Sequence, residues 1–310
     1  MHLSWHHKAL IARWISALPC NESIYKSIQK KFGRLKADPL SKIATQVEML
    51  NLLGKLGEDA SGKVILEVGT GAEMIVPVGY FLSGAEKCIS VDLNRRIDFG
   101  LFGESLKILV ESKEELMRMY DGYVRRDDFS QRMELIEKWR FDPRKFIVEA
   151  NIEYLAPADA GELQLLDSCV DLHISVNVLE HIPERAILQI MTEAQRVLKE
   201  SGMLLHFVDM TDHFAHTDFS ISKINFCRFS EEEWLKMAGN KFSYCNRLRA
   251  SDHLRLIGEA GFKVIEAKKA SDNESVQRIR SGEFSLDESF VHYDIDDLCF
   301  TGLKVLARPD

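Results

Sequence analysis

Acid–base groups gather in one short segment, HFVDMTDHFAHTDF, at the end of an apolar run. Three histidines and three aspartates lie within thirteen residues: His206, Asp209, Asp212, His213, His216 and Asp218. A histidine oriented by a carboxylate can take a proton from a substrate hydroxyl or amine. The same groups can hold a divalent metal ion that binds a substrate, or can simply bond to one another within a loop. Asp209 and His213 follow the apolar run most closely, so we predict that they and His216 are catalytic.

A second segment, ILEVGTGAEMIVP, has the form of a ligand-binding turn. An apolar run that contains Glu67 is followed by Gly69 and Gly71, and then by a helical pattern. Such a turn presents backbone N–H groups and a helix N-terminus to a ligand. The phosphate-binding pattern GxxxxGK[ST] is absent. The dinucleotide pattern GxGxxG is incomplete, because the third glycine is missing. Met74 stands at its place in the pattern, directly after Glu73.

Two carboxylates indicate which ligand the turn binds. Glu67 lies two residues before Gly69, where it would repel a pyrophosphate and pair with a cation such as a ligand ammonium group. S-adenosylmethionine has such a group and no phosphate. Asp92 ends the next apolar run and can accept both ribose hydroxyls, but it would serve NAD equally well. Glu67 therefore favours S-adenosylmethionine, whereas Asp92 does not discriminate.

Four stretches together resemble a known family. They are ILEVGTGAEMIVP, CISVDLN, PADAGELQLLDSCVDLHISVNVLEHIP and RVLKESGMLLHFVD. In order and spacing they are similar to the successive motifs of class I S-adenosylmethionine-dependent methyltransferases. The resemblance covers residues 61–208 and is closest to the small-molecule branch that carries VLEHIP. Some members of that branch have a bulky or polar residue in place of the third glycine, so Glu73 does not exclude cofactor binding.

The resemblance implies a set of cofactor-binding residues. Glu67, Gly69 and Gly71 would line the methionine end, and Asp92 would take the ribose hydroxyls. Asp159 would accept from the adenine amine. The full set that the resemblance implies is Glu67, Gly69, Thr70, Gly71, Asp92, Leu93, Asp159, Ala160 and Asn177.

The segment after Asn177 also bears on metal binding. Some RNA-methylating relatives bind a metal through an ExxEH pattern. Here Asn177 replaces the first acid and gives NxxEH with Glu180 and His181. We therefore predict no metal at this segment, and we interpret His181 as a structural histidine at a helix start.

The elements that position these residues alternate between strands and helices. Strands are predicted at 63–68, 88–91, 145–149 with 152–154, 170–175, 203–209, 262–267 and 298–307. Helices are predicted at 5–18, 40–56, 77–83, 99–140, 184–198 and 252–260. This alternation predicts a Rossmann-like, seven-stranded, mostly parallel sheet with helices on both faces. The last two strands lack a helical pattern between them, which predicts an antiparallel C-terminal hairpin.

The domain organisation follows from the same pattern. Residues 1–60 are predicted to form a helical extension or lid, and residues 61–310 a methyltransferase domain. Within that domain we expect a helical insert at about 94–145. An irregular segment at about 210–250 is predicted to cap the substrate.

Composition limits the class of protein. The chain has 310 residues with 45% hydrophobic and 28% charged residues, as in soluble globular proteins. Its six cysteines form no CxxC pair, so we expect reduced thiols and a cytoplasmic location. No apolar stretch is long enough to span a bilayer, and Arg13 interrupts the apolar N-terminal run, which argues against a signal peptide.

Charge is distributed unevenly along the chain. Residues 1–36 hold seven Lys or Arg and one acid, which gives them a local charge of +6. Because the whole chain has a net charge of −8, the remaining residues carry a charge of −14. An acidic body argues against a nucleic-acid partner. The basic N-terminus either contacts a membrane or another anionic surface, or is a solvated helix face. The sequence does not indicate an oligomeric state.

The observations together predict an S-adenosylmethionine-dependent methyltransferase. Its substrate would be a small or medium metabolite, such as a glycan, a lipid-linked intermediate or a secondary metabolite. Methylation at oxygen is favoured because the acid–base segment suits a hydroxyl. One alternative is a non-catalytic binding protein with the same fold. The other is an NAD-dependent oxidoreductase, which predicts GxGxxG and no Glu67.

Overall fold

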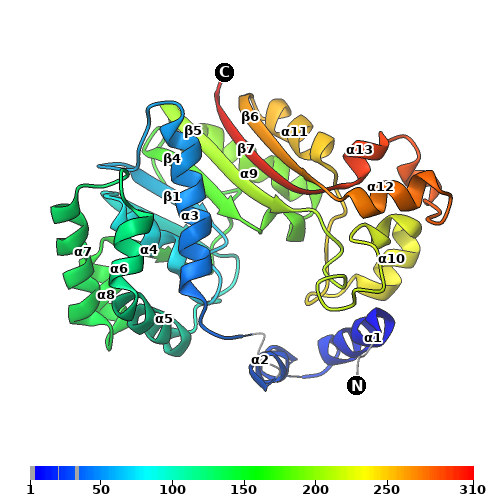
Figure 1. Cartoon of the computed structure of the whole chain (residues 1–310), viewed down its shortest axis with the longest axis horizontal. Helices are drawn as coiled ribbons and strands as arrows, with labels where there is room; N and C mark the ends of the chain where they lie inside the picture. The colour runs from blue at the N-terminus through cyan, green and yellow to red at the C-terminus, as the bar shows by residue number, and fades with distance from the viewer. Residues whose placement is uncertain (1–3, 20, 32–34) are drawn as a thin grey trace.

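A seven-stranded mixed sheet forms the centre of the molecule (Figure 1). The structure is a computed structural model that describes residues 4–19, 21–31 and 35–310. The strands are β1 (Val64–Val68), β2 (Lys87–Val91), β3 (Ile152–Leu155), β4 (Val170–Val176), β5 (Leu198–Asp209), β6 (Phe262–Ser271) and β7 (Phe300–Pro309). Their order is β3-β2-β1-β4-β5-β7-β6, with β1 to β5 parallel and β7 antiparallel to both of its neighbours. This arrangement confirms the predicted fold class.

Helices precede, cover and interrupt the sheet. The N-terminal helices are α1 (Trp5–Ser16), α2 (Asn21–Lys31) and α3 (Pro39–Gly54). Between the first strands lie α4 (Ile75–Leu82), α5 (Phe99–Glu111), α6 (Lys113–Met119), α7 (Arg126–Trp139) and α8 (Pro143–Glu149). The remaining α-helices are α9 (Glu184–Val197), α10 (Glu231–Ala238), α11 (Ala250–Glu259), α12 (Asn273–Arg280) and α13 (Ile295–Leu298). Three 3₁₀ turns complete the set: η1 (Leu179–His181), η2 (Asn225–Arg228) and η3 (Glu288–Phe290).

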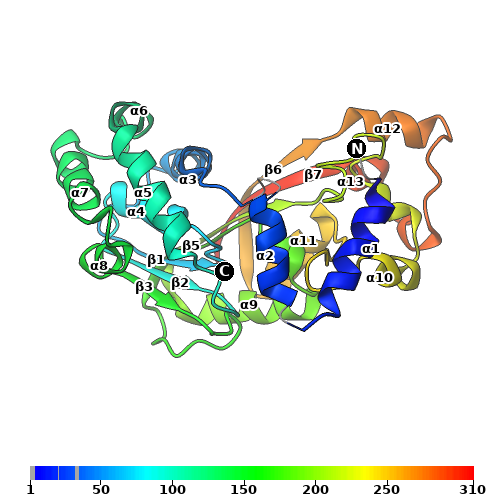
Figure 2. The same cartoon turned by 90° about the horizontal axis from the view of Figure 1, so that it is seen from below.

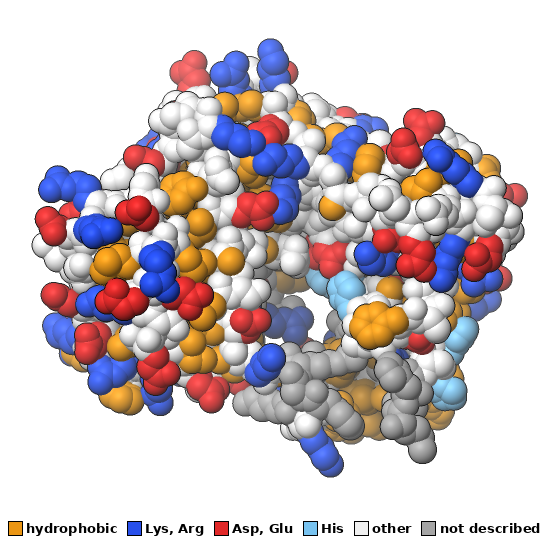
Figure 3. Space-filling model, viewed as in Figure 1, with side chains coloured by type: hydrophobic (Ala, Val, Ile, Leu, Met, Phe, Trp, Pro, Cys, Tyr) orange, Lys and Arg blue, Asp and Glu red, His pale blue; other side chains and the backbone are white. Residues whose placement is uncertain are grey.

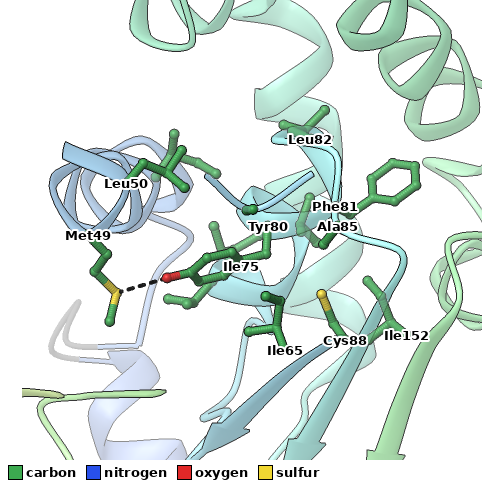
Figure 4. Packing of buried hydrophobic residues seen from close by; sticks show 14 of the residues in the cluster. Met49, Leu50, Ile65, Ile75, Tyr80, Phe81, Leu82, Ala85, Cys88 and Ile152 are labelled. Atoms are coloured by element: carbon green, nitrogen blue, oxygen red, sulfur yellow. Dashed lines mark hydrogen bonds between the residues drawn. The ribbon is translucent and has the colours of Figure 1, made fainter. Parts of the chain in front are cut away.

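Two apolar layers hold the sheet. Successive side chains of β1 point to opposite faces, so Ile65 packs under α3 and α4, whereas Leu66 packs against α9 and α11. Figure 4 shows the first layer, where Tyr80 of α4 lies between Ile65 and Met49 of α3. Glu67 follows Ile65 by two residues and therefore faces this first layer. The fold thus buries a carboxylate at the end of a core strand.

A third apolar cluster joins the N-terminal helix to the later part of the chain. Trp5 of α1 packs against Trp234 of α10, with ring centroids 6.2 Å apart. The Trp5 backbone N–H donates to Asp218 at 2.7 Å, and Lys8 Nζ donates to the Thr217 carbonyl at 2.8 Å. Figure 2 shows α1 beside α10, away from the layered sheet. The chain therefore returns its first helix to the segment that follows β5.

The prediction for 145–149 is wrong, because these residues belong to α8 and not to the third strand. Asp142 caps this helix by accepting from the Lys145 N–H, and Pro143 occupies its first turn. Both are standard helix-start signals that outweigh the short apolar run Phe146–Val148. The strand itself begins at Ile152, as the second half of that prediction states.

Two further segments differ from expectation. The pair β6 and β7 is antiparallel as predicted, but α12, η3 and α13 lie between the strands. Helix α12 is capped by Asp272 and buries only Ser275, so it has no apolar period to detect. The segment 210–250, expected to be irregular, contains α10, which Ser230 and Glu233 begin with a capping box.

Two general findings concern the described residues only. No helix among them is long and apolar enough to cross a membrane. The five cysteines among them are free thiols, and Cys20 lies outside the described residues.

Candidate cofactor and substrate site

The glycine turn lies between β1 and α4, where three residues adopt left-handed backbone conformations. Gly69 has φ +82°, Gly71 has φ +71° and Met74 has φ +53°. A Cβ atom on Gly69 would overlap the Val178 side chain, whereas one on Gly71 would meet nothing within 4 Å. Met74 has a positive φ, which glycine adopts most easily. Met74 therefore takes the place of the third glycine while keeping a left-handed backbone conformation. The turn therefore lies directly against the segment that follows β4.

Glu67 is buried beneath this turn. Its carboxylate accepts from Ser90 Oγ of β2 at 2.8 Å. Burial raises the pKa of Glu67 to about 7, and the Asp92 carboxylate adds to this effect, while the Ser90 hydroxyl opposes it. Next to it in the turn, Thr70 Oγ1 is buried and has no hydrogen-bond partner among the described residues. A buried carboxylate and a free hydroxyl fit the ammonium and carboxylate ends of an amino acid moiety.

Asp92 ends β2 on the other side of the turn. Burial raises its pKa to about 6, although Tyr154 Oη and the N–H groups of Gly71 and Thr70 stabilise its charge. Tyr154 donates to Asp92 at 3.0 Å and accepts from the Arg96 N–H at 3.0 Å. The sequence analysis did not identify Tyr154 as a site residue. Its position near the end of the third predicted strand is the signal that could have identified it. The next residue, Leu93, is 68% exposed and offers an apolar surface beside this carboxylate.

Glu73, which stands close to the missing glycine, ties the turn to neighbouring helices. Its carboxylate accepts from Lys42 Nζ at 2.5 Å, from Ser105 Oγ at 2.8 Å and from the Asp38 N–H at 3.0 Å. These bonds connect the turn to the start of α3 and to α5. Glu73 therefore anchors the site, and its own charge is already paired.

The remaining cofactor candidates lie at the same edge of the sheet. Asp159 is exposed and accepts from the Gly161 N–H at 2.8 Å, and Ala160 is buried. The Ala158 N–H donates to the Asp92 carbonyl at 3.0 Å, which holds this segment beside the end of β2. Asn177 has φ +53° and donates its N–H to the Phe207 carbonyl of β5. The structure therefore brings the predicted cofactor residues to the carboxyl ends of β1, β2, β3 and β4.

Asp209, His213 and His216 lie together beyond β5. Asp209 Oδ2 is 3.3 Å from His216 Nε2 and 3.7 Å from His213 Nε2. Burial opposes ionisation of Asp209, but His216 and the Thr211 hydroxyl and N–H hold its pKa at about 2. The bond to Asp209 raises the pKa of His216. Burial and the neighbouring His181 lower the pKa of His213 to about 4.

Glu180 and His181 approach His213 from the other strand. One ligand atom of each residue lies within 4.8 Å of the others. Glu180 is buried, and burial raises its pKa to about 8. His181 Nδ1 lies 3.0 Å from the Tyr244 carbonyl. Sequence reasoning treated the segments around His181 and His213 separately, whereas the pairing of β4 with β5 brings them together.

The other three members of the acid–base segment support the fold. His206 is fully buried in β5, where its Nδ1 bonds with Ser175 Oγ at 2.6 Å. Asp212 accepts from Asn225 Nδ2 at 3.1 Å and is buried. Asp218 accepts from the Trp5 N–H of α1. These three side chains are engaged inside the sheet or the segment 210–250.

The sheet topology and a family match bear on the class of protein. Dinucleotide-binding domains have strand order 3-2-1-4-5-6, whereas here β7 is inserted antiparallel between β5 and β6. Residues 114–206 match the family model of a methyltransferase domain. The match agrees with the expected class of S-adenosylmethionine-dependent methyltransferases and covers less than a third of the chain. The match begins after the glycine turn and ends in β5.

Solved structures are similar in fold. A protein from Pyrococcus horikoshii OT3 is 14% identical, with 86% of this chain and 90% of that chain covered and a TM-score of 0.46. Geranyl diphosphate C-methyltransferase from Streptomyces coelicolor A3(2) is 10% identical, with 86% and 78% covered and a TM-score of 0.47. Phosphoethanolamine N-methyltransferase 2 from Haemonchus contortus is 14% identical, with 86% and 52% covered and a TM-score of 0.47. No curated protein sequence matches this chain.

Proposed function

We propose that the enzyme transfers a methyl group from S-adenosylmethionine to an oxygen of a small or medium metabolite. The substrate classes that we favour are a glycan, a lipid-linked intermediate and a secondary metabolite. The observation that carries this proposal is the position of Asp209, His213 and His216, which lie together at the end of β5, with only β4 between β5 and the strand before the glycine turn. We also propose that the enzyme works in the cytoplasm, where free thiols are stable.

The proposed cofactor site uses the buried and edge groups described above. Glu67 would accept from the ammonium group, with Gly69, Thr70 and Gly71 against the methionine end. Asp92 would take the ribose hydroxyls beside Leu93. Asp159 and Ala160 would flank the adenine, and Asn177 would face the reacting methyl group. S-adenosylmethionine supplies a methyl group on a positively charged sulfur, so the protein has to align the acceptor and exclude water.

Proton removal from the acceptor is assigned to the groups beyond β5. Asp209 lies 3.3 Å from His216 Nε2 and orients that ring, as a carboxylate does for a general base. Val178, which packs against Gly69, lies two residues before Glu180. This contact places the edge beside the cofactor turn. A hydroxyl held between the two would have the methyl group on one side and a proton acceptor on the other.

Water exclusion is assigned to two segments. We propose that residues 1–60 act as a helical extension and lid, and that the segment 210–250 caps the substrate of the 61–310 domain. The insert at about 94–145 is filled by α5 to α8, which pack on the sheet away from the proposed substrate. Figure 3 shows a hollow near the centre of this face, with histidine side chains at its upper right edge.

Calorimetry tests the proposal. The purified chain should bind S-adenosylmethionine and S-adenosylhomocysteine and should not bind NAD. Asp92→Ala should weaken that binding without unfolding the protein. His216→Ala and His213→Ala should retain cofactor binding and lower the rate of methyl transfer in a screen of hydroxylated acceptors. Cofactor binding with no transfer to any acceptor class would favour the non-catalytic binding protein.

A further inference from the structure

Glu180 is the buried group that the proposed methyl transfer does not use. It lies in η1 just after β4 and is 2% exposed. In the part of the chain that the structure describes, neither of its carboxyl oxygens makes a well-aligned hydrogen bond, although the N–H groups of Glu180 and Asp209 lie near enough to lower its pKa slightly against the larger effect of burial. Buried polar groups in proteins nearly always have partners, because an unpaired one is costly. A carboxyl group left with both oxygens free therefore indicates a ligand that binds there.

Two histidines complete the surroundings of Glu180. The ligand atoms of Glu180, His181 and His213 all lie within 4.8 Å of one another. His213 Nε2 is buried and makes no hydrogen bond among the described residues. The carbonyl of Tyr244 can only accept, so His181 Nδ1 carries the proton and Nε2 keeps its lone pair. Two imidazoles and one carboxyl group are thus available at one point.

The surrounding backbone fixes these groups. Asn246 donates its N–H to the Glu180 carbonyl at 2.9 Å, and its side-chain amide donates to the carbonyls of Leu179 and Ile182 at 2.7 and 2.8 Å. The Tyr244 carbonyl orients the His181 ring in the way that carbonyls orient metal-binding histidines. Asp209 Oδ2 lies 3.7 Å from His213 Nε2 and places a negative charge beside the cluster.

Contrary to the expectation from the NxxEH pattern, we propose that Glu180, His181 and His213 bind a divalent transition-metal ion, with zinc as the best fit. Two histidines and a glutamate, with a further position open, form the ligand set of catalytic zinc sites, and related sets bind iron(II). Ligand atoms around tetrahedral zinc lie about 3.4 Å apart, given bonds of about 2.0–2.1 Å. Binding therefore has to draw the present atoms together by at most about 1.4 Å.

The open position gives the metal a role at the proposed active site, and this part rests on the proposed function. A hydroxyl of the acceptor would bind there and lose its proton more readily. The oxygen electron pair would then form the bond to the methyl carbon. The carbon–sulfur bond would break with its electrons going to sulfur, and the proton would pass to His216.

Titration of the full chain with metal alone tests the site. After treatment with a chelator and its removal, we expect wild-type protein to bind one Zn²⁺ in calorimetry and one Co²⁺ with visible absorption bands. His213→Ala and Glu180→Gln should weaken Zn²⁺ binding by more than about 100-fold, since even outer-shell changes cost 10–100-fold. His292→Ala, which removes an exposed histidine elsewhere, should leave it unchanged.

Cofactor binding separates the possible failures. Each variant should retain S-adenosylmethionine affinity, which shows that it is folded. Should Glu180→Gln lose that affinity, His181→Ala serves as the second ligand variant. Equal Zn²⁺ affinity in wild type and in the ligand variants, or no binding by wild type, would overturn the metal site. Failure to bind S-adenosylmethionine would count against the proposed function and leave the metal titration to be judged separately.

Discussion

Glu67 belongs to the proposed cofactor site, and its buried charge lowers the stability of the ligand-free protein. Its pKa is about 7 in the folded chain, against 4.5 for an ordinary glutamate, so the folded state holds the proton more tightly. The stabilisation from that proton is fully present below pH 4.5 and is lost as the pH rises through 7. The difference between the two pKa values corresponds to about 3 kcal/mol of unfolding free energy.

Glu67→Gln should therefore stabilise the ligand-free protein at high pH only. At pH 8 we expect its unfolding free energy to exceed that of wild type by up to about 3 kcal/mol, with little difference near pH 4.5. Urea unfolding of both proteins at the two pH values measures this. Glu86→Gln, on an exposed residue, is the matched control. A stability gain of equal size at both pH values would contradict burial of the charge as its cause.

The two glycines of the turn provide a second comparison. Both have positive φ, so alanine at either position costs about 1–2 kcal/mol in backbone strain. Only at Gly69 does the added Cβ also meet Val178. Gly69→Ala should therefore lower the unfolding free energy and the S-adenosylmethionine affinity more than Gly71→Ala. Equal losses in urea unfolding and calorimetry would mean that the contact with Val178 is not tight.

Local sequence determines part of the site and tertiary pairing determines the rest. Glu67, Gly69 and Asp92 lie where strand–turn–helix reasoning put them, because a short apolar run and its following turn fix their positions. The approach of Glu180 to His213 depends on β4 and β5 being neighbours, and no spacing within either segment reveals it. Val178 against Gly69 is hidden for the same reason.

At the level of elements, apolar runs predicted the strands and capping signals decided the exceptions. The run at 145–149 has strand-like residues, yet Asp142 and Pro143 start a helix there. Helices α10 and α12 escaped detection because they are polar surface helices that begin with good caps. Attention to caps before periodicity would have recovered all three.

Helix α1 offers a prediction at this level. Trp5 is buried against the cap, whereas Trp14 of the same helix is 74% exposed. Removing a buried tryptophan costs about 3–5 kcal/mol, so Trp5→Ala should release α1 from α10. We expect faster hydrogen exchange at residues 5–16 with unchanged exchange in β1 and β4. Trp14→Ala is the control and should exchange as wild type does. Unchanged protection of α1 in Trp5→Ala would show that other contacts hold it.

For the molecule as a whole, charge separation along the chain leads to a prediction about surfaces. Among the basic residues of 1–36, Lys26 pairs with Asp98, and Arg34 and the side chain of Lys30 lie outside the described part. Exposed apolar side chains lie on the neighbouring helix α1, namely Leu10, Ile11 and Trp14. A basic helical segment beside exposed apolar groups is of the kind that lies on anionic membranes, so we predict such a contact.

Sedimentation with lipid vesicles tests this surface. The protein should bind vesicles containing anionic lipid and release them as salt rises from about 50 to 500 mM, because the Debye length shortens. Neutral vesicles should not bind it. Trp14→Ala should weaken binding, whereas replacement of Phe219, which is exposed in the segment 210–250, should not. Binding to neutral and anionic vesicles alike would exclude an electrostatic contact.

The position of β7 has a consequence for the order in which the protein folds. Residues 300–309 lie between β5 and β6, and Leu303, Val305 and Ala307 are buried in the sheet. During synthesis, β5 is complete about a hundred residues before its partner emerges. Its free edge is open to pairing with other chains throughout that interval. The nascent chain therefore depends on late insertion of a strand between two others, and deletion of residues 300–309 should cause aggregation of the product.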